Sequence, residues 1–434
     1  MIIMFQKNDP KIIRAWYMYD WANSVYSLSI TTAIFPVYYS ESVRNAFNGE
    51  MISFFGHNVK DSVLYSMALS FSFLVVAVIS PFLSGIADYS CRKKSFMRVF
   101  TYLGSFSCAA LYFFTGKNVE YGILCSVLAS IGFAGSLVFY NSYLPDIATA
   151  DKFDSFSAKG FTAGYAGSVI LLVINLLNII FYDSLGFQEK NDAIRFTFIT
   201  VGLWWFGFSH LTFYYLPENV YVEKLGKSHI LVSGFYELIK VYKQLKNLPN
   251  LKIFLLSFFF YIMGAITVIY MASIFASEEL GLEAPKLVAV IIALQLVAIA
   301  GASYFAWLSE KIGNKRTLVI MIIVWAVICA GAYLTKNEYE FYLLAVVVGL
   351  VMGGIQSLSR STYSKLIPEN TVDTASFFSF YDVTEKLATV SGTFIFGLMN
   401  IITGNMRMSA LALSVFFVAG LIIMIRFKLA RNTN

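Results

Sequence analysis

Long apolar runs, separated by short polar segments, make up most of the chain. A run of about 20 apolar residues is long enough to cross a bilayer as a helix. Such runs lie at residues 16–40, 63–87, 96–115, 121–143, 159–182, 196–216, 253–276, 287–308, 317–334, 341–363, 377–402 and 408–427. The pattern predicts an all-α integral membrane protein with twelve transmembrane helices and no room for a soluble domain.

Composition and charge agree with a membrane location. Hydrophobic residues make up 58% of the chain and charged residues 13%, compared with about 25% charged residues in a soluble domain. If both termini are placed on one side, 23 of the 32 Lys and Arg residues fall there, 8 on the other side and Lys386 within a helix. Because cytoplasmic loops are rich in Lys and Arg, we expect cytoplasmic termini and a multi-pass protein of the cell membrane, the inner membrane in a bacterium. The basic charge then reflects topology, and no nucleic-acid partner is expected.

The longest connection lies in the middle of the chain, at residues 217–251, and separates two sets of six helices. We interpret residues 1–216 and 252–434 as two six-helix bundles and residues 217–251 as a cytoplasmic linker. Within the linker, apolar side chains recur at helical spacing on one face, and these are Phe235, Leu238, Ile239, Tyr242 and Leu245. This spacing predicts a short helix on the membrane surface.

Two sequence matches indicate that the halves are repeats of each other. Aligning SGIADYSCRKK with AWLSEKIGNKR pairs Asp88 with Glu310, an offset of 222 residues. Aligning FYNSYLPDI with TYSKLIPEN pairs Tyr140 with Tyr363, an offset of 223 residues. Because two separate matches give nearly one offset, we expect parallel copies related by a pseudo-two-fold axis along the membrane normal.

These motifs resemble a known family. The acidic-then-basic loop of each half resembles the signature loop of the major facilitator superfamily, and its charged residues here are Asp88, Arg92 and Lys93 in the first copy and Glu310, Lys315 and Arg316 in the second. YDWANS in the first helix, GGIQSLSRSTYSKLIPEN in the tenth and FFSFYDVTEK in the eleventh resemble the branch that includes the vacuolar amino-acid effluxer of fungal autophagy and its bacterial relatives. The resemblance implies a secondary transporter with a central cavity between its halves, working by alternating access. The charged loop residues would act in gating.

The residues themselves give no sign of an enzyme. The chain contains no G-x-x-x-x-G-K-[ST] phosphate-binding loop, and the three histidines, His57, His210 and His229, lack the spacing of metal ligands. No nucleophile and base occur in a recognisable arrangement. The sequence therefore predicts a transporter without a cofactor or a metal site.

A carboxylate within the first apolar run requires an explanation. On insertion scales an ionised Asp at the centre of a membrane helix costs roughly 2.5–3.5 kcal/mol, so Asp20 needs either a partner or a function. At α-helical spacing a polar stripe is formed by Asp20, Ser24, Ser27 and Thr31. Asp20 is then either a group that couples transport to protons or one member of a fixed ion pair.

The other intramembrane polar residues give further candidates. A guanidinium such as Arg360 suits a substrate carboxylate, and an ion pair at an inner gate is the alternative. The candidate substrate or coupling residues are Asp20, Asn23, Ser24, Ser27, Asn141, Gln356 and Arg360. In the eleventh helix, Asp382 and Lys386 are one turn apart and Glu385 is adjacent. We assign these three residues to gating, because a compensated triad can hold the halves together.

The predicted function is secondary transport of a small polar solute, with amino-acid efflux by a monomer as the first hypothesis and proton coupling as an option. A lipid or amphiphile translocator, or a drug or sugar transporter on the same fold, is the alternative.

Overall fold

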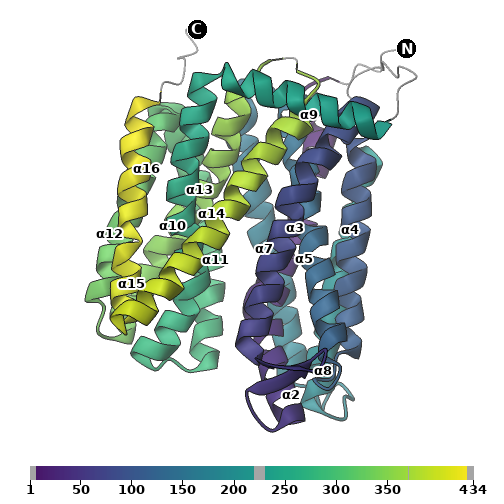
Figure 1. Ribbon diagram of the computed structural model, residues 1–434, viewed down its shortest axis with the longest axis vertical. Coiled ribbons are helices and arrows are strands. Elements are labelled where there is room, and N and C mark those ends of the chain that lie inside the picture. Colours follow the sequence, from purple (N-terminus) through teal and green to yellow (C-terminus); the bar gives the residue numbers. More distant parts are fainter. Residues whose placement is uncertain (1–5, 219–229, 370, 428–434) are drawn as a thin grey trace.

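The computed structural model describes residues 6–218, 230–369 and 371–427, and nearly all of them are helical (Figure 1). The first set comprises α1 (Pro10–Val25), the π-helical η1 (Tyr26–Ala33), α2 (Phe35–Phe47), α3 (Asp61–Ser90), α4 (Lys93–Ala110), α5 (Val119–Ser142), the short α6 (Leu144–Ile147), α7 (Phe153–Ile180) and α8 (Lys190–Tyr215). The second set comprises α10 (Pro249–Leu280), α11 (Ala284–Ile312), α12 (Asn314–Leu334), α13 (Glu338–Leu366), α14 (Thr374–Thr403), α15 (Met406–Ala412) and α16 (Ser414–Arg426). Between them lies α9 (Ile230–Lys246).

The apolar runs coincide with these helices. Ten helices of the described residues are long and apolar enough to cross a membrane, which confirms an all-helical membrane fold. Two of the predicted runs give less clear spans. The run at residues 16–40 is divided between α1, η1 and α2. The run at residues 96–115 lies mainly on α4, which carries Lys93, Lys94 and Arg98 within its 18 residues.

The first membrane helix changes its geometry near the middle. From Tyr26 to Ala33 the backbone is π-helical, with hydrogen bonds between residues five apart. The Thr32 hydroxyl donates to the carbonyl of Ser27, five residues earlier, at 2.9 Å. The prediction that Thr31 lies in line with Asp20 assumed α-helical geometry throughout, and it is wrong because the π-segment shifts every residue after Val25 around the helix axis.

Each helix set packs mainly within itself. In the first set α1 lies against α7 and α8, and α4 lies against α5 and α8. In the second set α10 lies against α14 and α16, and α12 against α13 and α16. The sets meet where α3 lies against α14 and where α7 lies against α11 and α13 (Figure 1).

The two ends of the molecule differ. At one end, which we call the α9 end, α9 lies across the helix termini (Figure 1). The end of α16 also lies at this end (Figure 1). The residues before α1 contact α6, since Asn8 N donates to the carbonyl of Ile147 at 2.8 Å. At the opposite end strands β1 (Met51–Phe54) and β2 (His57–Lys60) form an antiparallel hairpin. The hairpin lies in a loop whose structure the sequence analysis did not predict.

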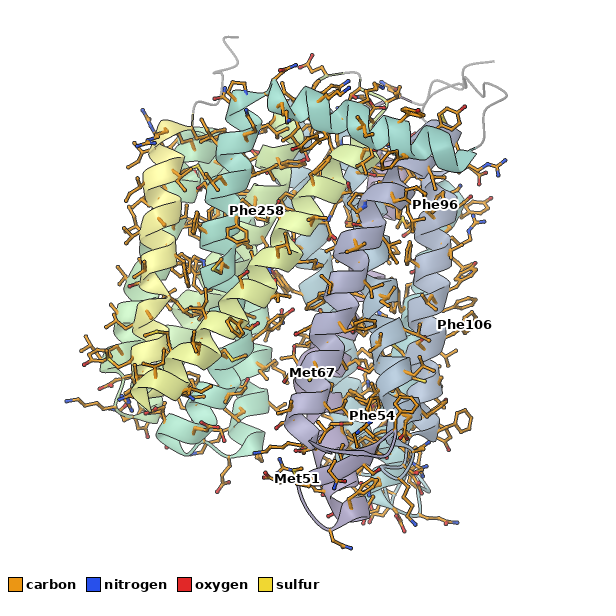
Figure 2. The ribbon with its side chains drawn as sticks, viewed as in Figure 1. Met51, Phe54, Met67, Phe96, Phe106 and Phe258 are labelled. Atoms are coloured by element: carbon orange, nitrogen blue, oxygen red, sulfur yellow. The ribbon has the colours of Figure 1, made fainter. Side chains whose placement is uncertain are left out.

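Apolar side chains remain exposed along the outside of the helices. Figure 2 shows Met67 on α3 and Phe106 on α4 pointing away from the bundle, and these residues are 63% and 60% exposed. A soluble monomer rarely exposes such a continuous apolar surface. This surface fits the hydrocarbon core of a bilayer.

Candidate transport site

Asp20 has the partner that its burial requires. Arg360 Nη1 of α13 lies 3.3 Å from Asp20 Oδ2 of α1, and the Tyr140 hydroxyl of α5 donates to the same oxygen at 2.6 Å. Asp20 and Arg360 are 5% and 2% exposed. This Asp20–Arg360 pair therefore joins the two helix sets through a buried contact between residues 340 positions apart in the chain.

The guanidinium of Arg360 is fully engaged. Its Nε donates to Ser157 Oγ at 2.9 Å, Nη2 to the Ser157 carbonyl at 2.9 Å, and Nη1 to Asn141 Oδ1 at 3.1 Å. The rings of Trp16 and Phe161 lie 4.8 and 4.4 Å from its central carbon, within the range of cation–π attraction. In this conformation a substrate carboxylate could reach Arg360 only by displacing a protein partner.

Two glycines of α7 make the close packing around this pair possible. A Cβ atom at Gly160 would lie 2.5 Å from Asp20 Oδ2 and 2.8 Å from Arg360 Nη2. A Cβ atom at Gly164 would lie 2.4 Å from Ser24 Oγ. A side chain at either position would displace the side chains of Asp20 and Arg360 or of Ser24. The sequence contains a signal for this approach, since Gly160 and Gly164 form a G-x-x-x-G pattern.

The other predicted residues lie around the pair. The Ser24 hydroxyl lies 3.5 Å from Asn23 Oδ1, and the Ser27 hydroxyl donates to the Ser24 carbonyl at 2.9 Å. Gln356 Oε1 accepts a hydrogen bond of 2.7 Å from the Tyr165 hydroxyl of α7. The site residues that the sequence analysis missed are Trp16, Tyr140, Ser157, Phe161 and Tyr165.

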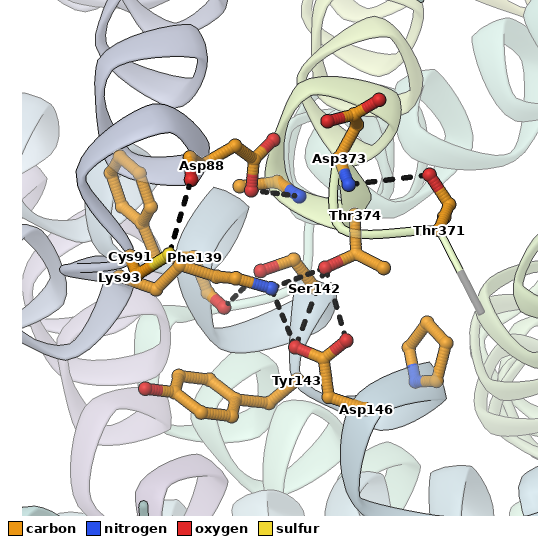
Figure 3. A network of polar contacts seen from close by, with 12 residues as sticks. Asp88, Cys91, Lys93, Phe139, Ser142, Tyr143, Asp146, Thr371, Asp373 and Thr374 are labelled. Atoms are coloured by element: carbon orange, nitrogen blue, oxygen red, sulfur yellow. Dashed lines mark hydrogen bonds and ion pairs between the residues drawn. The ribbon is translucent and has the colours of Figure 1, made fainter. Parts of the chain in front are cut away.

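A second buried group joins α3 to α14 at the α9 end (Figure 3). We call it the Asp88 cluster, and it consists of Asp88, Lys93, Asp146 and Thr374. Asp88 accepts hydrogen bonds from the backbone N–H groups of Ala375 and Ser376 at 3.1 and 2.7 Å, at the start of α14. Lys93 lies 2.5 Å from Asp146 Oδ2 and also donates to Thr374. Carboxylates are stabilised at helix N-termini, so this cluster holds the two sets together.

Within the first loop, the basic residue that makes this contact is Lys93. Arg92, its predicted companion in gating, is exposed, whereas Lys93 is 5% exposed. Asp146 was not among the predicted site residues. The sequence contains a signal for Asp146, because this carboxylate directly follows Pro145 at the end of an apolar helix and lies within a repeated motif.

A third buried group, the Asp154 cluster, joins α7 to α13 near the same end. Asp154 Oδ2 lies 2.6 Å from Lys365 Nζ and accepts a hydrogen bond from the Ser309 hydroxyl at 3.1 Å. Asn314 Nδ2 donates to Asp154 Oδ1 at 2.7 Å. Asp154 is 4% exposed, and no sequence prediction included it.

The gating residues predicted from the second loop are placed differently. Glu310 and Arg316 are exposed, and Lys315 donates to the Ile425 carbonyl within its own helix set. Within residues 6–218, 230–369 and 371–427, no hydrogen bond or ion pair of these three side chains joins the two sets. Where α7 meets α13, the buried carboxylate is that of Asp154. Asp154 belongs to the first helix set, whereas Glu310 belongs to the second.

The predicted pair on the eleventh membrane helix is confirmed. Lys386 Nζ lies 3.4 Å from Asp382 Oδ1 and 3.2 Å from Glu385 Oε1. The same ammonium lies 5.7 Å from the ring centre of Phe73 on α3. We call Asp382, Glu385 and Lys386 the α14 triad, and it is located where the two helix sets meet.

Solved structures share the fold of this chain. The chain superposes on the outward conformation of the major facilitator superfamily transporter FucP with a TM-score of 0.72 at 13% identity, covering 98% of this chain and 99% of that one. A bacterial homologue of the iron transporter ferroportin, in its outward-facing state, gives a TM-score of 0.67 at 11% identity, covering 96% and 98% of the two chains. The chain therefore has the major facilitator fold.

The sequence comparisons identify the family. The family described as "Vacuole effluxer Atg22 like" matches residues 8–434, and the chain belongs to it. The uncharacterized MFS-type transporter YxiO of Bacillus subtilis (strain 168) is 30% identical over 420 residues, which cover 96% of this chain and 95% of the relative. Autophagy-related protein 22 of Kluyveromyces lactis is 26% identical over 463 residues, with 94% and 92% coverage.

Proposed function

We propose that this chain is a secondary active transporter that exports amino acids by alternating access. The Asp20–Arg360 pair is the observation that carries this proposal. It places a carboxylate and a guanidinium 3.3 Å apart between the two helix sets, and an amino-acid zwitterion carries the two complementary charges. Binding of the substrate carboxylate to Arg360 and of its ammonium to Asp20 would replace the contact between the sets. The match to a family of vacuole effluxers supports a transport function.

The proposed architecture is a monomer with twelve transmembrane helices in two six-helix bundles, residues 1–216 and 252–434. The linker of residues 217–251, which includes α9, would lie on the cytoplasmic side, with α9 as the proposed surface helix. Residues 219–229 lie outside the described part. With the α9 end cytoplasmic, the Asp88 and Asp154 clusters close the inner side of the transporter. This agrees with the outward conformations of the two solved transporters above.

Exchange assays test the proposed substrate class. We expect purified protein in proteoliposomes to exchange radiolabelled neutral amino acids across the membrane in the absence of any ion gradient. Arg360→Lys should retain expression and lose most of this exchange, because a lysine cannot reproduce the planar set of donors. Exchange of sugars or nucleosides with no exchange of amino acids would contradict the proposal.

Cysteine labelling tests the orientation. Lys117 and Lys311 are both exposed, between α4 and α5 and near the end of α11, respectively. With a membrane-impermeant reagent on intact cells, we expect Lys117→Cys to be labelled and Lys311→Cys to be labelled only after permeabilisation. Labelling of Lys311→Cys in intact cells would reverse the assigned topology.

A further inference from the structure

We propose that the α14 triad binds one transported proton and that it, and not Asp20, couples transport to a proton gradient. The inference rests on the proposed transport function and extends it by naming the ion and its site. The sequence analysis placed these three residues in gating. The geometry points to a further role.

The first argument is charge balance. Two carboxylates, Asp382 and Glu385, share the single ammonium of Lys386 at 3.4 and 3.2 Å, so the triad carries one net negative charge when both carboxylates are ionised. Asp20 faces one cation and also accepts a hydrogen bond from Tyr140, so it is already compensated. An uncompensated charge inside a membrane protein is strongly unfavourable. One bound proton makes the triad neutral.

The second argument is an unpartnered oxygen. Asp382 is 3% exposed, and no donor among the described residues reaches its Oδ2 atom. A buried carboxylate oxygen without a hydrogen bond is costly. Protonation of the group lowers this cost because the neutral acid is much less strongly hydrated than the ion. The vacant lone pairs of Oδ2 therefore offer a place for the proton.

The third argument is access. The Glu385 side chain is 29% exposed, and at 100° per residue it lies about 160–180° around α14 from Leu387, Phe394 and Ile401. Leu387, Phe394 and Ile401 are 46%, 69% and 82% exposed and form the outer face of the helix. Glu385 thus opens toward the interior between the sets and not toward lipid. A proton from the interior would reach the partly exposed Glu385 first. It would reach the buried Asp382 afterwards.

In the part of the chain that the structure describes, Lys386 is the one cation that forms an ion pair with Asp382 or Glu385. From α10, Tyr270 lies within electrostatic range of Glu385 and Lys386, and α3 contributes the Phe73 ring. Several charged or titratable groups on helices packed against α14 have contacts of their own. They include Asp88 on α3 with Ala375 and Ser376, Tyr140 on α5 with Asp20, Lys240 on α9 with Asp373, Tyr261 on α10 with Ser359, and Arg407 on α15 with Glu279. Arg360 of α13 acts on the adjacent Tyr381 but pairs with Asp20.

The position of the triad links proton binding to the conformational change. α3 and α14 come from different sets, and the Asp88 cluster joins them at the α9 end. The triad lies on the same helix pair, about 15 Å further along α14 from Ser376 to Lys386, with Lys386 against Phe73 of α3. A change in the charge of the triad therefore acts on a contact that must separate when the inner side opens.

An infrared titration tests proton binding without a substrate. We expect purified full-length protein in detergent to show the carbonyl band of a protonated carboxylic acid that disappears as pH rises, and we expect this band to be absent in Glu385→Gln and Asp382→Asn. Glu279→Gln is the matched control, since Glu279 pairs with Arg407 one to one at 2.8 Å, and it should retain the band. A titrating band that is unchanged in both triad variants would overturn the proposal. If Asp382→Asn does not fold, Glu385→Gln, with its partly exposed side chain, decides the result.

A transport assay tests coupling. A gradient of one pH unit supports up to about tenfold accumulation for one proton per substrate, so we expect this accumulation of a radiolabelled amino acid in wild type and in Glu279→Gln. Glu385→Gln should keep gradient-free exchange and lose the accumulation. Wild-type exchange that ignores the pH gradient, or normal accumulation by Glu385→Gln, would overturn proton coupling by the triad. An absence of any amino-acid exchange in wild type would instead count against the proposed substrate class, and the infrared result would still decide whether the triad binds the proton.

Discussion

Asp20→Asn is expected to destabilise the protein by about 3–5 kcal/mol, the effect of removing one partner of a buried ion pair. Arg360 would keep its charge at 2% exposure and lose its only anionic partner among the described residues. We expect a clearly lower thermal melting temperature in detergent and little transport in proteoliposomes. The measurement separates the two roles left open by the sequence, because a residue that only couples transport to protons would leave the melting temperature unchanged.

The double variant Asp20→Asn, Arg360→Gln is the control for this interpretation. Removing both charges leaves no unpaired ion, so the double variant should recover much of the stability lost in Asp20→Asn while remaining inactive in exchange. Arg360→Lys retains the charge and should melt closer to wild type. A double variant no more stable than Asp20→Asn would show that Asp20 stabilises the fold through Tyr140 or packing and not through Arg360.

The helices could be predicted from the sequence because the bilayer requires them. A long apolar run in a membrane satisfies its own backbone hydrogen bonds by forming a helix, and the predicted runs are mainly helical here, although the first and the last are each divided between shorter helices. The π-segment from Tyr26 to Ala33 could not be predicted in this way. Its sequence, YSLSITTA, contains no residue that marks a change of helix type, and the hydrogen-bond pattern depends on how α1 and α2 pack against the rest of the bundle.

The candidate site could be predicted residue by residue but not as a set of contacts. Asp20 and Arg360 were recognisable because an intramembrane charge is expensive and needs a reason. Their pairing depends on the distance between α1 and α13, which only the packing of the two sets determines. Tyr140, Ser157 and Gly160 complete the site, yet such residues occur in most membrane helices and carry no distinguishing signal.

The predicted gating residues show what a repeated motif leaves undetermined. The repeat indicated Asp88, which accepts hydrogen bonds from the start of α14, and it indicated Glu310 as the equivalent carboxylate of the second half. Glu310 is exposed. Asp154 is buried at the corresponding contact between α7 and α13, so the two inter-set contacts use carboxylates of the same helix set. A loop motif gives the residue types near an interface, but the rotation of each helix decides which side chain enters it.

Loss of the carboxylate of Asp88 or of Asp154 is expected to open the α9 end. Hydrogen bonds to a charged group contribute about 1.5–3 kcal/mol, so Asp88→Asn or Asp154→Asn should raise the population of the open state roughly ten- to hundredfold. Ser364, which is 3% exposed beside the Asp154 cluster, provides the reporter as Ser364→Cys. Its labelling rate by a maleimide in inside-out vesicles should rise by the same factor. Cys91, which is partly exposed, must first be replaced by serine, while the other three cysteines are buried.

Glu310→Gln is the decisive control for this prediction, because it removes the carboxylate that the repeat indicated and that no described contact joins to the other set. We expect its Ser364→Cys labelling rate to equal that of the parent protein. Since the Asp88 and Asp154 clusters share no residue, their effects should be close to additive, and the double variant should be labelled faster than either single one. Faster labelling in Glu310→Gln than in Asp154→Asn would mean that the second loop closes the α9 end, contrary to the contacts of Asp154 with Lys365 and Asn314.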